Sequence, residues 1–161
     1  MEYTKALVIA KKVKELISPY CYRAEIAGSI RRKKLEVKDI EIVAIPKPFE
    51  TGLFESGIAT IINKWQKVKG ELPCKYTQRV LLEGIKLDLF FATRENWGLI
   101  YAIRTGSSSY SHKVLGYNWK KRGYTSKEGN LYFKNNRVNV LEERDLFNRI
   151  GVKYIGPEWR R

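Results

Sequence analysis

Residues 27–45 have the sequence AGSIRRKKLEVKDIEIVAI, in which a Gly-Ser pair and a basic loop precede alternating acidic and apolar residues. The alternation begins at Asp39 and stops before Pro46, which predicts a β-strand over residues 39–45. Successive side chains of a strand point to opposite faces, so Asp39 and Glu41 share one face of this strand and its isoleucines share the other.

A third carboxylate lies in a second predicted strand, residues 85–91, which read IKLDLFF. Asp88 stands there between two leucines that point into the opposite layer. If the two strands are neighbours, Asp88 joins Asp39 and Glu41 in one pocket, where the three anions raise one another's pKa unless a cation neutralises them. Oxygen-only ligands suit Mg²⁺, and two such ions about 4 Å apart activate a hydroxyl nucleophile and stabilise a leaving phosphate.

The residues before the first carboxylates suit a phosphate group. Gly28 and Ser29 follow a short predicted strand, residues 23–27, and their N–H groups let a phosphate approach closely. Arg32 can neutralise charge on a leaving pyrophosphate. Each feature alone is more often a plain turn, an edge charge or a solvated loop, and only their joint order is specific.

Composition excludes several other kinds of chemistry. The 161 residues include 31 Lys+Arg against 17 Asp+Glu, which gives a net charge of +14, and the 43% hydrophobic content excludes global disorder. His112 is the only histidine, so a Ser-His-Asp centre has one candidate base and a Cys/His zinc site lacks ligands. Catalysis is therefore expected to use carboxylates, cations or a hard metal.

Several features predict a cytoplasmic protein that is not secreted and has no membrane partner. No apolar run is long enough to span a bilayer, and the N-terminal apolar stretch, residues 6–10, is too short for a signal peptide. Cys21 and Cys74 are expected to be reduced thiols, with a single disulfide as the alternative.

The excess positive charge is concentrated late in the chain. Residues 101–161 carry +8 of the +14, and residues 104–137 hold eight cations and six interleaved aromatic residues against Glu128. A basic surface with aromatic residues is expected of a protein that binds a phosphate backbone. The alternative is a charged surface that only keeps the protein soluble.

Apolar spacing and turn residues predict an α+β fold with an α/β lobe to about residue 100 and a smaller basic α+β lobe after it. Thr93 is the expected cap of the third helix and Gly151 that of the last. The predicted helices cover residues 6–17, 58–69, 93–104, 109–122 and 142–150, and the predicted strands residues 23–27, 39–45, 76–82 and 85–91, with a small hairpin about Asn135-Asn136.

In this order, the Gly-Ser pair and the carboxylates resemble the nucleotidyltransferase superfamily typified by polymerase beta. Residues 27–32 (AGSIRR) look like the start of the palm of X-family DNA polymerases, and residues 104–107 (RTGS) look like that family's palm-to-thumb junction. Residues 121–124 (KRGY) and 151–158 (GVKYIGPE) look like its thumb and closing segment. The match covers nearly the whole chain and is nearest to the reduced viral or phage members, which keep only palm and thumb.

The resemblance implies a nucleotidyltransferase palm over residues 1–102 and a thumb-like subdomain over residues 103–161. It implies template-directed addition of dNTPs to a primer 3′ end with two Mg²⁺ ions, which Mn²⁺ can replace, in gap-filling DNA repair. Asp39 and Glu41 would bind both metals, and Asp88 would bind the catalytic metal and help the primer hydroxyl lose its proton. The implied partners are gapped or primed DNA and dNTPs. The chain would act as a monomer in a bacterial cell or one infected by a virus or phage, with or without a repair partner such as a ligase.

The resemblance also implies roles for residues outside the carboxylate set. Ser29 and Arg32 would hold the β- and γ-phosphates, and Gly28, Gly106 and Ser107 would lie close to the nucleotide. The candidate DNA-binding residues are Arg104, Tyr110, His112, Lys113, Lys120, Lys121 and Arg122.

The chain departs from the family pattern at three places. Glu41 stands where polymerases usually carry Asp, and its extra methylene shifts the ligand. Ile103 and Arg104 stand where many members place an aromatic pair beside the sugar, which leaves the choice between dNTPs and rNTPs open. The helix after Ser107 needs a one-residue insertion.

Two other functions fit parts of the sequence. One is a template-independent nucleotidyltransferase that modifies a nucleic-acid end, a protein or a small molecule, although the basic segment 104–137 argues against a small substrate. The other is a binding module that has lost its chemistry, against which Asp39, Glu41 and Asp88 together argue. Trp119 is expected either in a core or facing nucleic acid.

Overall fold

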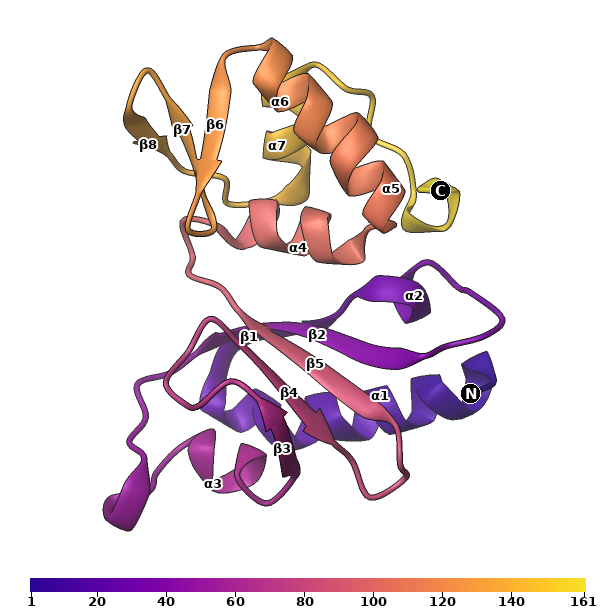
Figure 1. Ribbon diagram of the computed structural model, residues 1–161, viewed down its shortest axis with the longest axis vertical. Coiled ribbons are helices and arrows are strands. Elements are labelled where there is room, and N and C mark those ends of the chain that lie inside the picture. Colours follow the sequence, from indigo (N-terminus) through magenta and orange to yellow (C-terminus); the bar gives the residue numbers. More distant parts are fainter. The chain divides into compact units, whose positions relative to one another are not determined.

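The structure is a computed structural model that describes all residues, 1–161, and it divides into two compact units, Met1–Ala92 and Thr93–Arg161 (Figure 1). The division lies before helix α4 (Trp97–Thr105), whereas the expected boundary at residue 102 lies inside that helix. The reason is that Leu99 and Ala102 of α4 are buried in the core of the second unit.

The first unit is built on a five-stranded sheet with the order β1-β2-β5-β4-β3. Its strands are β1 (Cys21–Ile26), β2 (Asp39–Pro46), β3 (Gln66–Lys69), β4 (Tyr76–Val80) and β5 (Lys86–Phe91). Strands β2 and β5 pair in parallel and the other neighbours are antiparallel. The α+β class predicted from the sequence is therefore confirmed, and the two carboxylate-bearing strands are neighbours at the centre of the sheet.

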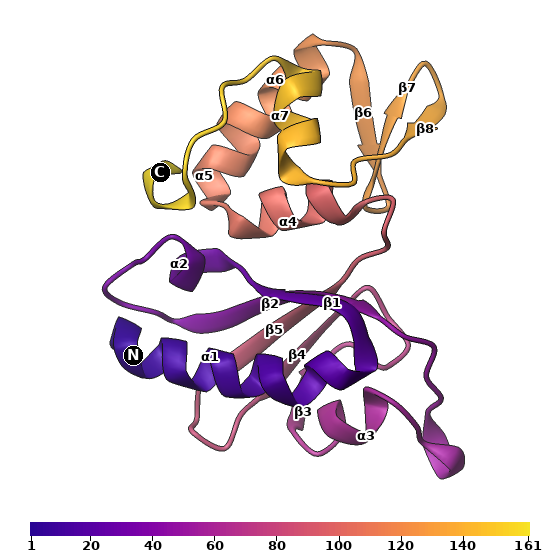
Figure 2. The same ribbon diagram turned by 180° about the vertical axis from the view of Figure 1, so that it is seen from behind.

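Helices α1 (Tyr3–Ile17) and α3 (Ala59–Ile62) cover one face of this sheet (Figures 1 and 2). The core between them and the strands contains aliphatic side chains such as Ile9, Ile40 and Leu87. Burial of each such side chain stabilises the folded state by roughly 1.5–3 kcal/mol. The short helix α2 (Gly28–Arg31) lies in the connection from β1 to β2, and the 3₁₀ turns are Ser18–Tyr20 and Gly52–Phe54.

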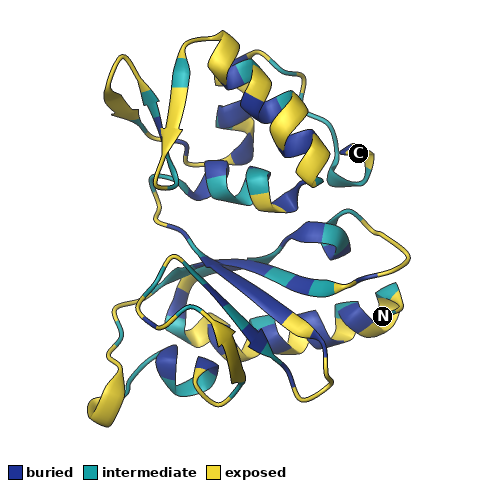
Figure 3. Cartoon of the chain, viewed as in Figure 1, coloured by how far each residue is buried: buried dark blue, intermediate teal, exposed yellow.

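The helix predicted over residues 58–69 is wrong beyond its first turn. Helix α3 ends at Ile62, and residues 66–69 form β3, the edge strand that pairs antiparallel with β4. All four residues of β3 are exposed (Figure 3). The apolar spacing over residues 58–65 suits a helix, but backbone pairing with β4 determines the structure of the residues that follow.

The second unit surrounds a three-stranded antiparallel sheet with short helices. The strands are β6 (Tyr124–Lys127), β7 (Asn130–Phe133) and β8 (Asn136–Val138), and the helices after α4 are α5 (Ser108–Tyr110), a π-helix (Ser111–Gly116), α6 (Tyr117–Lys121), α7 (Glu143–Ile150) and a 3₁₀ turn (Pro157–Trp159). The hairpin about Asn135 is confirmed, and so is left-handed Gly151 as the cap of α7, whereas β6 was not predicted. The cap of α4 is Asn96 rather than Thr93, whose N–H donates to the Asn96 side chain.

A buried ion pair holds the end of the chain to α7. Arg160 is wholly buried, and its Nη1 lies 2.7 Å from Oε1 of Glu143. Its Nε donates to the carbonyl of Ile155, and its guanidinium packs against the rings of Phe147 and Tyr154. Removing one member of such a pair leaves a buried charge without compensation, which typically costs about 3–5 kcal/mol.

None of the helices has the length and apolar character that a bilayer crossing requires. Cys21 and Cys74 are both free thiols, as expected. Burial raises the pKa of the Cys21 thiol to about 11. Trp97 is buried, whereas Trp159 is exposed.

Helix α4 crosses the start of α7 at Gly98, and this contact generates the first prediction. A Cβ added at Gly98 would overlap the main chain of Glu142, so Gly98→Ala should destabilise the protein by about 1–3 kcal/mol. Alanine at an uncrowded helical glycine stabilises by up to about 1 kcal/mol instead. Urea unfolding distinguishes the two signs, with Asn148→Ala on the exposed side of α7 as the control. A more stable Gly98→Ala protein would contradict the tight crossing.

Candidate active site

The parallel pairing of β2 with β5 brings the predicted carboxylates together. Glu41 is the register partner of Asp88, and Asp39 is the partner of Lys86, two residues before Asp88. The neighbouring isoleucines of β2 and leucines of β5 belong to the core beneath α1. The three carboxylates therefore occupy the other face of the sheet, as the alternation along each strand predicted.

Asp88 is held by two hydrogen bonds from β4. It is only 8% exposed, and its Oδ1 accepts the hydroxyl of Tyr76 at 2.6 Å and Nε2 of Gln78 at 2.7 Å. Gln78 is the register partner of Asp88 on β4, so the hairpin connecting the two strands fixes this contact. Two donors thus satisfy this carboxylate oxygen in its buried position.

The other two carboxylates have raised proton affinities. Burial, reinforced by the charge of Asp39, raises the pKa of Glu41 to about 7 even though Arg32 opposes the change. Burial and the charge of Asp88 raise the pKa of Asp39 as well. Arg32 experiences the converse effect, since burial lowers its pKa while Glu41 and Asp39 act to raise it. The site is thus short of positive charge, which a bound cation would supply.

The Gly28-Ser29 turn lies directly against Glu41. Gly28 has a φ of +59°, and a Cβ built on it would overlap the Glu41 carboxylate, so only glycine allows this approach. The backbone N–H of Ser29 donates to that carboxylate. The Oγ of Ser29 is buried and has no hydrogen-bond partner. The turn therefore binds one anion, Glu41, and offers a further donor beside it.

The donor chemistry of the site fits a hard divalent cation. Asp39, Glu41 and Asp88 supply only oxygen atoms, which Mg²⁺ prefers, and they lie on adjacent strands. In this arrangement no three His, Cys, Asp or Glu side chains form a ready-made metal-binding group. The contacts explain this, because Glu41 is directed toward Ser29 and one oxygen of Asp88 is bonded to β4.

Gly106 and Ser107 form the turn between α4 and α5 in the second unit. Gly106 has a φ of +64° and caps α4, and the Gly106–Ser107 peptide bond is cis. The Oγ of Ser107 accepts the N–H of Tyr110 and so caps α5, while the N–H of Ser107 donates to the carbonyl of Arg160. Both residues thus have structural roles in this unit.

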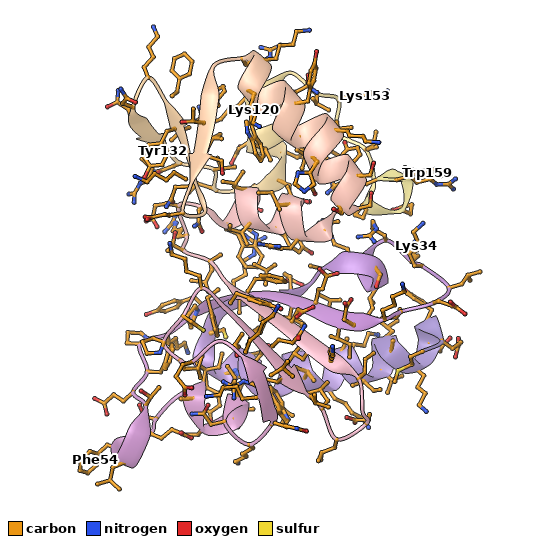
Figure 4. All side chains as sticks on the ribbon, viewed as in Figure 1. Lys34, Phe54, Lys120, Tyr132, Lys153 and Trp159 are labelled. Carbon is orange, nitrogen blue, oxygen red and sulfur yellow. The ribbon has the colours of Figure 1, made fainter.

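Most of the candidate DNA-binding residues are exposed. The exposed ones are Arg104 on α4, His112 and Lys113 on the π-helix, and Lys120, Lys121 and Arg122 at the end of α6. The guanidinium of Arg122 lies over Gly151, where an added Cβ would overlap it. Lys153 and Trp159 also point outward in this unit (Figure 4).

Two aromatic residues of the basic segment are directed inward. Tyr110 is buried in the core of the second unit, and burial raises the pKa of its phenol. It therefore lacks the exposed surface expected of a DNA-binding residue. Trp119 is also buried in this core, so the expectation of a core position is correct and that of a nucleic-acid contact is not.

The helix after Ser107, in which the family pattern predicted a one-residue insertion, contains a π-helix. Residues Ser111–Gly116 form i→i+5 turns between the α-helical segments α5 and α6. A π-turn accommodates one extra residue without breaking the helix. The hydroxyl of Ser111 donates to the carbonyl of Ile103, which joins the π-helix to α4.

Tyr76 and Gln78 were not among the sequence candidates, although they contact Asp88 directly. The signal was available, because the turn at Glu83-Gly84 sets the hairpin register and so pairs Gln78 with Asp88. Neither residue belongs to a motif that chemistry alone would single out.

The raised pKa of Glu41 predicts a pH-dependent stability. The unfolded carboxyl ionises near its ordinary pKa of 4.5 and the folded one near 7, so stability falls as pH rises through this interval. In a chelating buffer at pH 8, Glu41→Gln should therefore be more stable than the wild type, by about 1–3 kcal/mol. The gain should shrink toward pH 5.

Urea unfolding at both pH values tests this prediction. Glu83→Gln in the exposed hairpin turn is the matched control and should leave stability unchanged. An equal gain from Glu41→Gln at pH 5 and pH 8 would show that ionisation of this carboxyl is not the cause.

Compared by sequence, the chain matches no protein-family model and none of the curated proteins. Compared by structure, it is similar to polymerase beta of Leishmania infantum in a ternary P/T complex, with a TM-score of 0.77 at 15% sequence identity. The similarity covers 100% of this chain and 76% of that one. At this level of identity the likeness concerns the fold. The chain thus has a polymerase beta-like fold.

Proposed function

We propose that this protein is a DNA polymerase that adds dNTPs to a primer 3′ end on a template, in the manner of gap-filling repair. The observation that carries the proposal is the register pair Glu41–Asp88, with Asp39 beside it and the Gly28-Ser29 turn against Glu41. The polymerase beta-like fold supports the same reading. We assign the palm role to the first unit and the thumb role to the second, as in reduced viral or phage enzymes. The protein acts as a monomer in the cytoplasm.

The carboxylates divide the work of the reaction. In the reaction the primer 3′-oxygen bonds to the α-phosphorus of the dNTP, the bond to the bridging oxygen breaks, and pyrophosphate leaves. Asp39, Glu41 and Asp88 would hold the Mg²⁺ ions, which would supply charge stabilisation to the attacking and leaving oxygens. Asp88 also draws the proton of the primer hydroxyl toward it.

The turn before β2 holds the triphosphate. Ser29 contributes its N–H and its buried Oγ, which has no partner within the protein, and Arg32 contributes positive charge. The incoming phosphates replace the Glu41 carboxylate at the Ser29 N–H, which frees Glu41 to act with Asp39 and Asp88.

Primer extension tests the proposal directly. On a one-nucleotide gap with Mg²⁺, the wild type should incorporate the dNTP that matches the template. Asp88→Asn keeps the shape of the side chain but removes its charge. The transition state should lose several kcal/mol of stabilisation, so the rate should fall on the order of 1,000-fold. Glu83→Gln, in the turn of the same hairpin, should extend at the wild-type rate.

The same assay distinguishes the other functions. Untemplated tailing by the wild type would replace the proposal with a template-independent nucleotidyltransferase. DNA binding with no incorporation in Mg²⁺ or Mn²⁺ would leave only a binding module.

The exposed cations of the second unit predict salt-dependent DNA binding. The logarithm of the affinity for gapped DNA should fall steeply and linearly with the logarithm of the salt concentration. Lys120→Ala should lessen this slope by about 1, the value for one lost phosphate contact. Fluorescence anisotropy measures both, with Lys67→Ala as the control because Lys67 pairs with Glu71 on the first unit. An affinity that does not change with salt would contradict an electrostatic interface.

A further inference from the structure

Two side chains of strand β4 lie on the face of the sheet that carries the carboxylates, and no motif assigns a role to either of them. Tyr76 and Gln78 alternate along β4, so both point to the face that carries Asp88. They donate to the same carboxylate oxygen, Oδ1, at 2.6 and 2.7 Å. Both distances lie in the usual range for hydrogen bonds to a carboxylate.

The position of Tyr76 is fixed independently of Asp88. Its ring stacks on Phe90, with centroids 4.8 Å apart and planes inclined by 18°, and Phe90 is the register partner of Tyr76 on β5. The same ring has a second contact, because the ammonium of Lys69 on β3 lies 5.1 Å from the centroid of the Tyr76 ring. The hydroxyl thus reaches Asp88 from a ring that its neighbours hold in place.

The two oxygens of the Asp88 carboxylate differ in their contacts with β4. Strand β5 lies between β4 and β2 in the sheet. Both donors on β4 bind Oδ1 of Asp88, which leaves Oδ2 without a hydrogen bond from β4, and the strand on the other side of β5 carries Glu41 and Asp39. Rotation of the Asp88 carboxylate would break two hydrogen bonds at once.

We infer that Tyr76 and Gln78 are positioning residues that hold the Asp88 carboxylate with Oδ2 toward the reacting groups. This inference rests on the proposed polymerase function and adds to it the two side chains that orient the third carboxylate. Neither residue touches the substrate. Their contribution is geometric, since misplacing a reacting group by a fraction of an ångström slows the chemical step without weakening substrate binding.

Single-turnover incorporation on a one-nucleotide gap tests the inference with Tyr76→Phe and Gln78→Met. Tyr76→Phe keeps the ring stack and removes only the hydroxyl, and Gln78→Met keeps the length of the side chain and removes the donor. Each should lower the maximal rate roughly tenfold, and together they should lower it by more than either alone, because hydrogen bonds to charged groups are the stronger ones. The apparent dissociation constant for the dNTP should stay within about twofold of the wild type.

Matched controls come from the same unit. Tyr22→Phe removes an exposed hydroxyl from β1, and Gln66→Met removes an exposed amide from β3. Both should incorporate nucleotide at the wild-type rate. A fall in rate with these variants equal to that of the β4 variants would overturn the inference, because the effect would then be a general loss of sheet integrity.

A measurement without nucleotide or metal tests the contact itself. In chelating buffer, Tyr76→Phe should lower the urea midpoint of unfolding, and this loss should disappear when Asp88 is already replaced in Asp88→Ala. If Tyr76→Phe lowers the urea midpoint equally in the Asp88→Ala background, the stabilising contact between Tyr76 and Asp88 does not exist and the inference is overturned.

The outcomes separate the two proposals. A wild-type enzyme that incorporates nucleotide while Tyr76→Phe and Gln78→Met match its rate would overturn the positioning role and leave the polymerase intact. Rate losses that come entirely from weaker dNTP binding would overturn it as well. A wild type that incorporates nothing would overturn both.

Discussion

Electrostatic repulsion between carboxylates on adjacent parallel strands is the constraint around which the first unit is organised. Glu41 and Asp88 are register partners at the centre of the sheet, where burial weakens their hydration. The surrounding groups offset this repulsion in three ways: Arg32 supplies positive charge, Ser29 donates an N–H to Glu41, and β4 donates two hydrogen bonds to Asp88. The opposite face of the same two strands is apolar and largely buried beneath α1, so the hydrophobic core offsets the cost of the acidic face.

The parts of the fold that could be predicted from sequence are those in which periodicity and burial agree. Alternation placed Asp39 and Glu41 on one face of β2, and helical spacing with a glycine cap located α7. The exposed edge strand β3 could not be predicted, because pairing with β4 rather than its own sequence makes it a strand. For the candidate site, alternation along each strand was sufficient to place the carboxylates on the face opposite the core. The orientation of Glu41 toward Ser29 depends on burial and on close approach at Gly28, which spacing does not encode.

The second unit shows how one basic segment can serve both a core and a surface. Its aromatic residues include Tyr110 and Trp119, which are buried, while cations such as Lys113 and Lys120 are exposed. In the helical part of the segment this interleaving follows from helical periodicity, since a helix packed on one side buries every third or fourth residue. The composition that suggested a nucleic-acid surface is in part the composition of an amphipathic helix with a cationic outer face.

The π-helix at Ser111–Gly116 has a consequence for how this segment can vary in length. One added residue in a regular α-helix rotates everything beyond it by about 100°, which would turn a buried side chain such as Trp119 out to solvent. The wider turn absorbs that rotation within six residues, so α5 and α6 both keep their buried sides on the same core. A change in length would thereby be confined to the stretch that exposes His112 and Lys113. A surface loop is the usual place for a protein to accept an insertion, and a π-helix lets a helix accept one while its flanking turns keep their register.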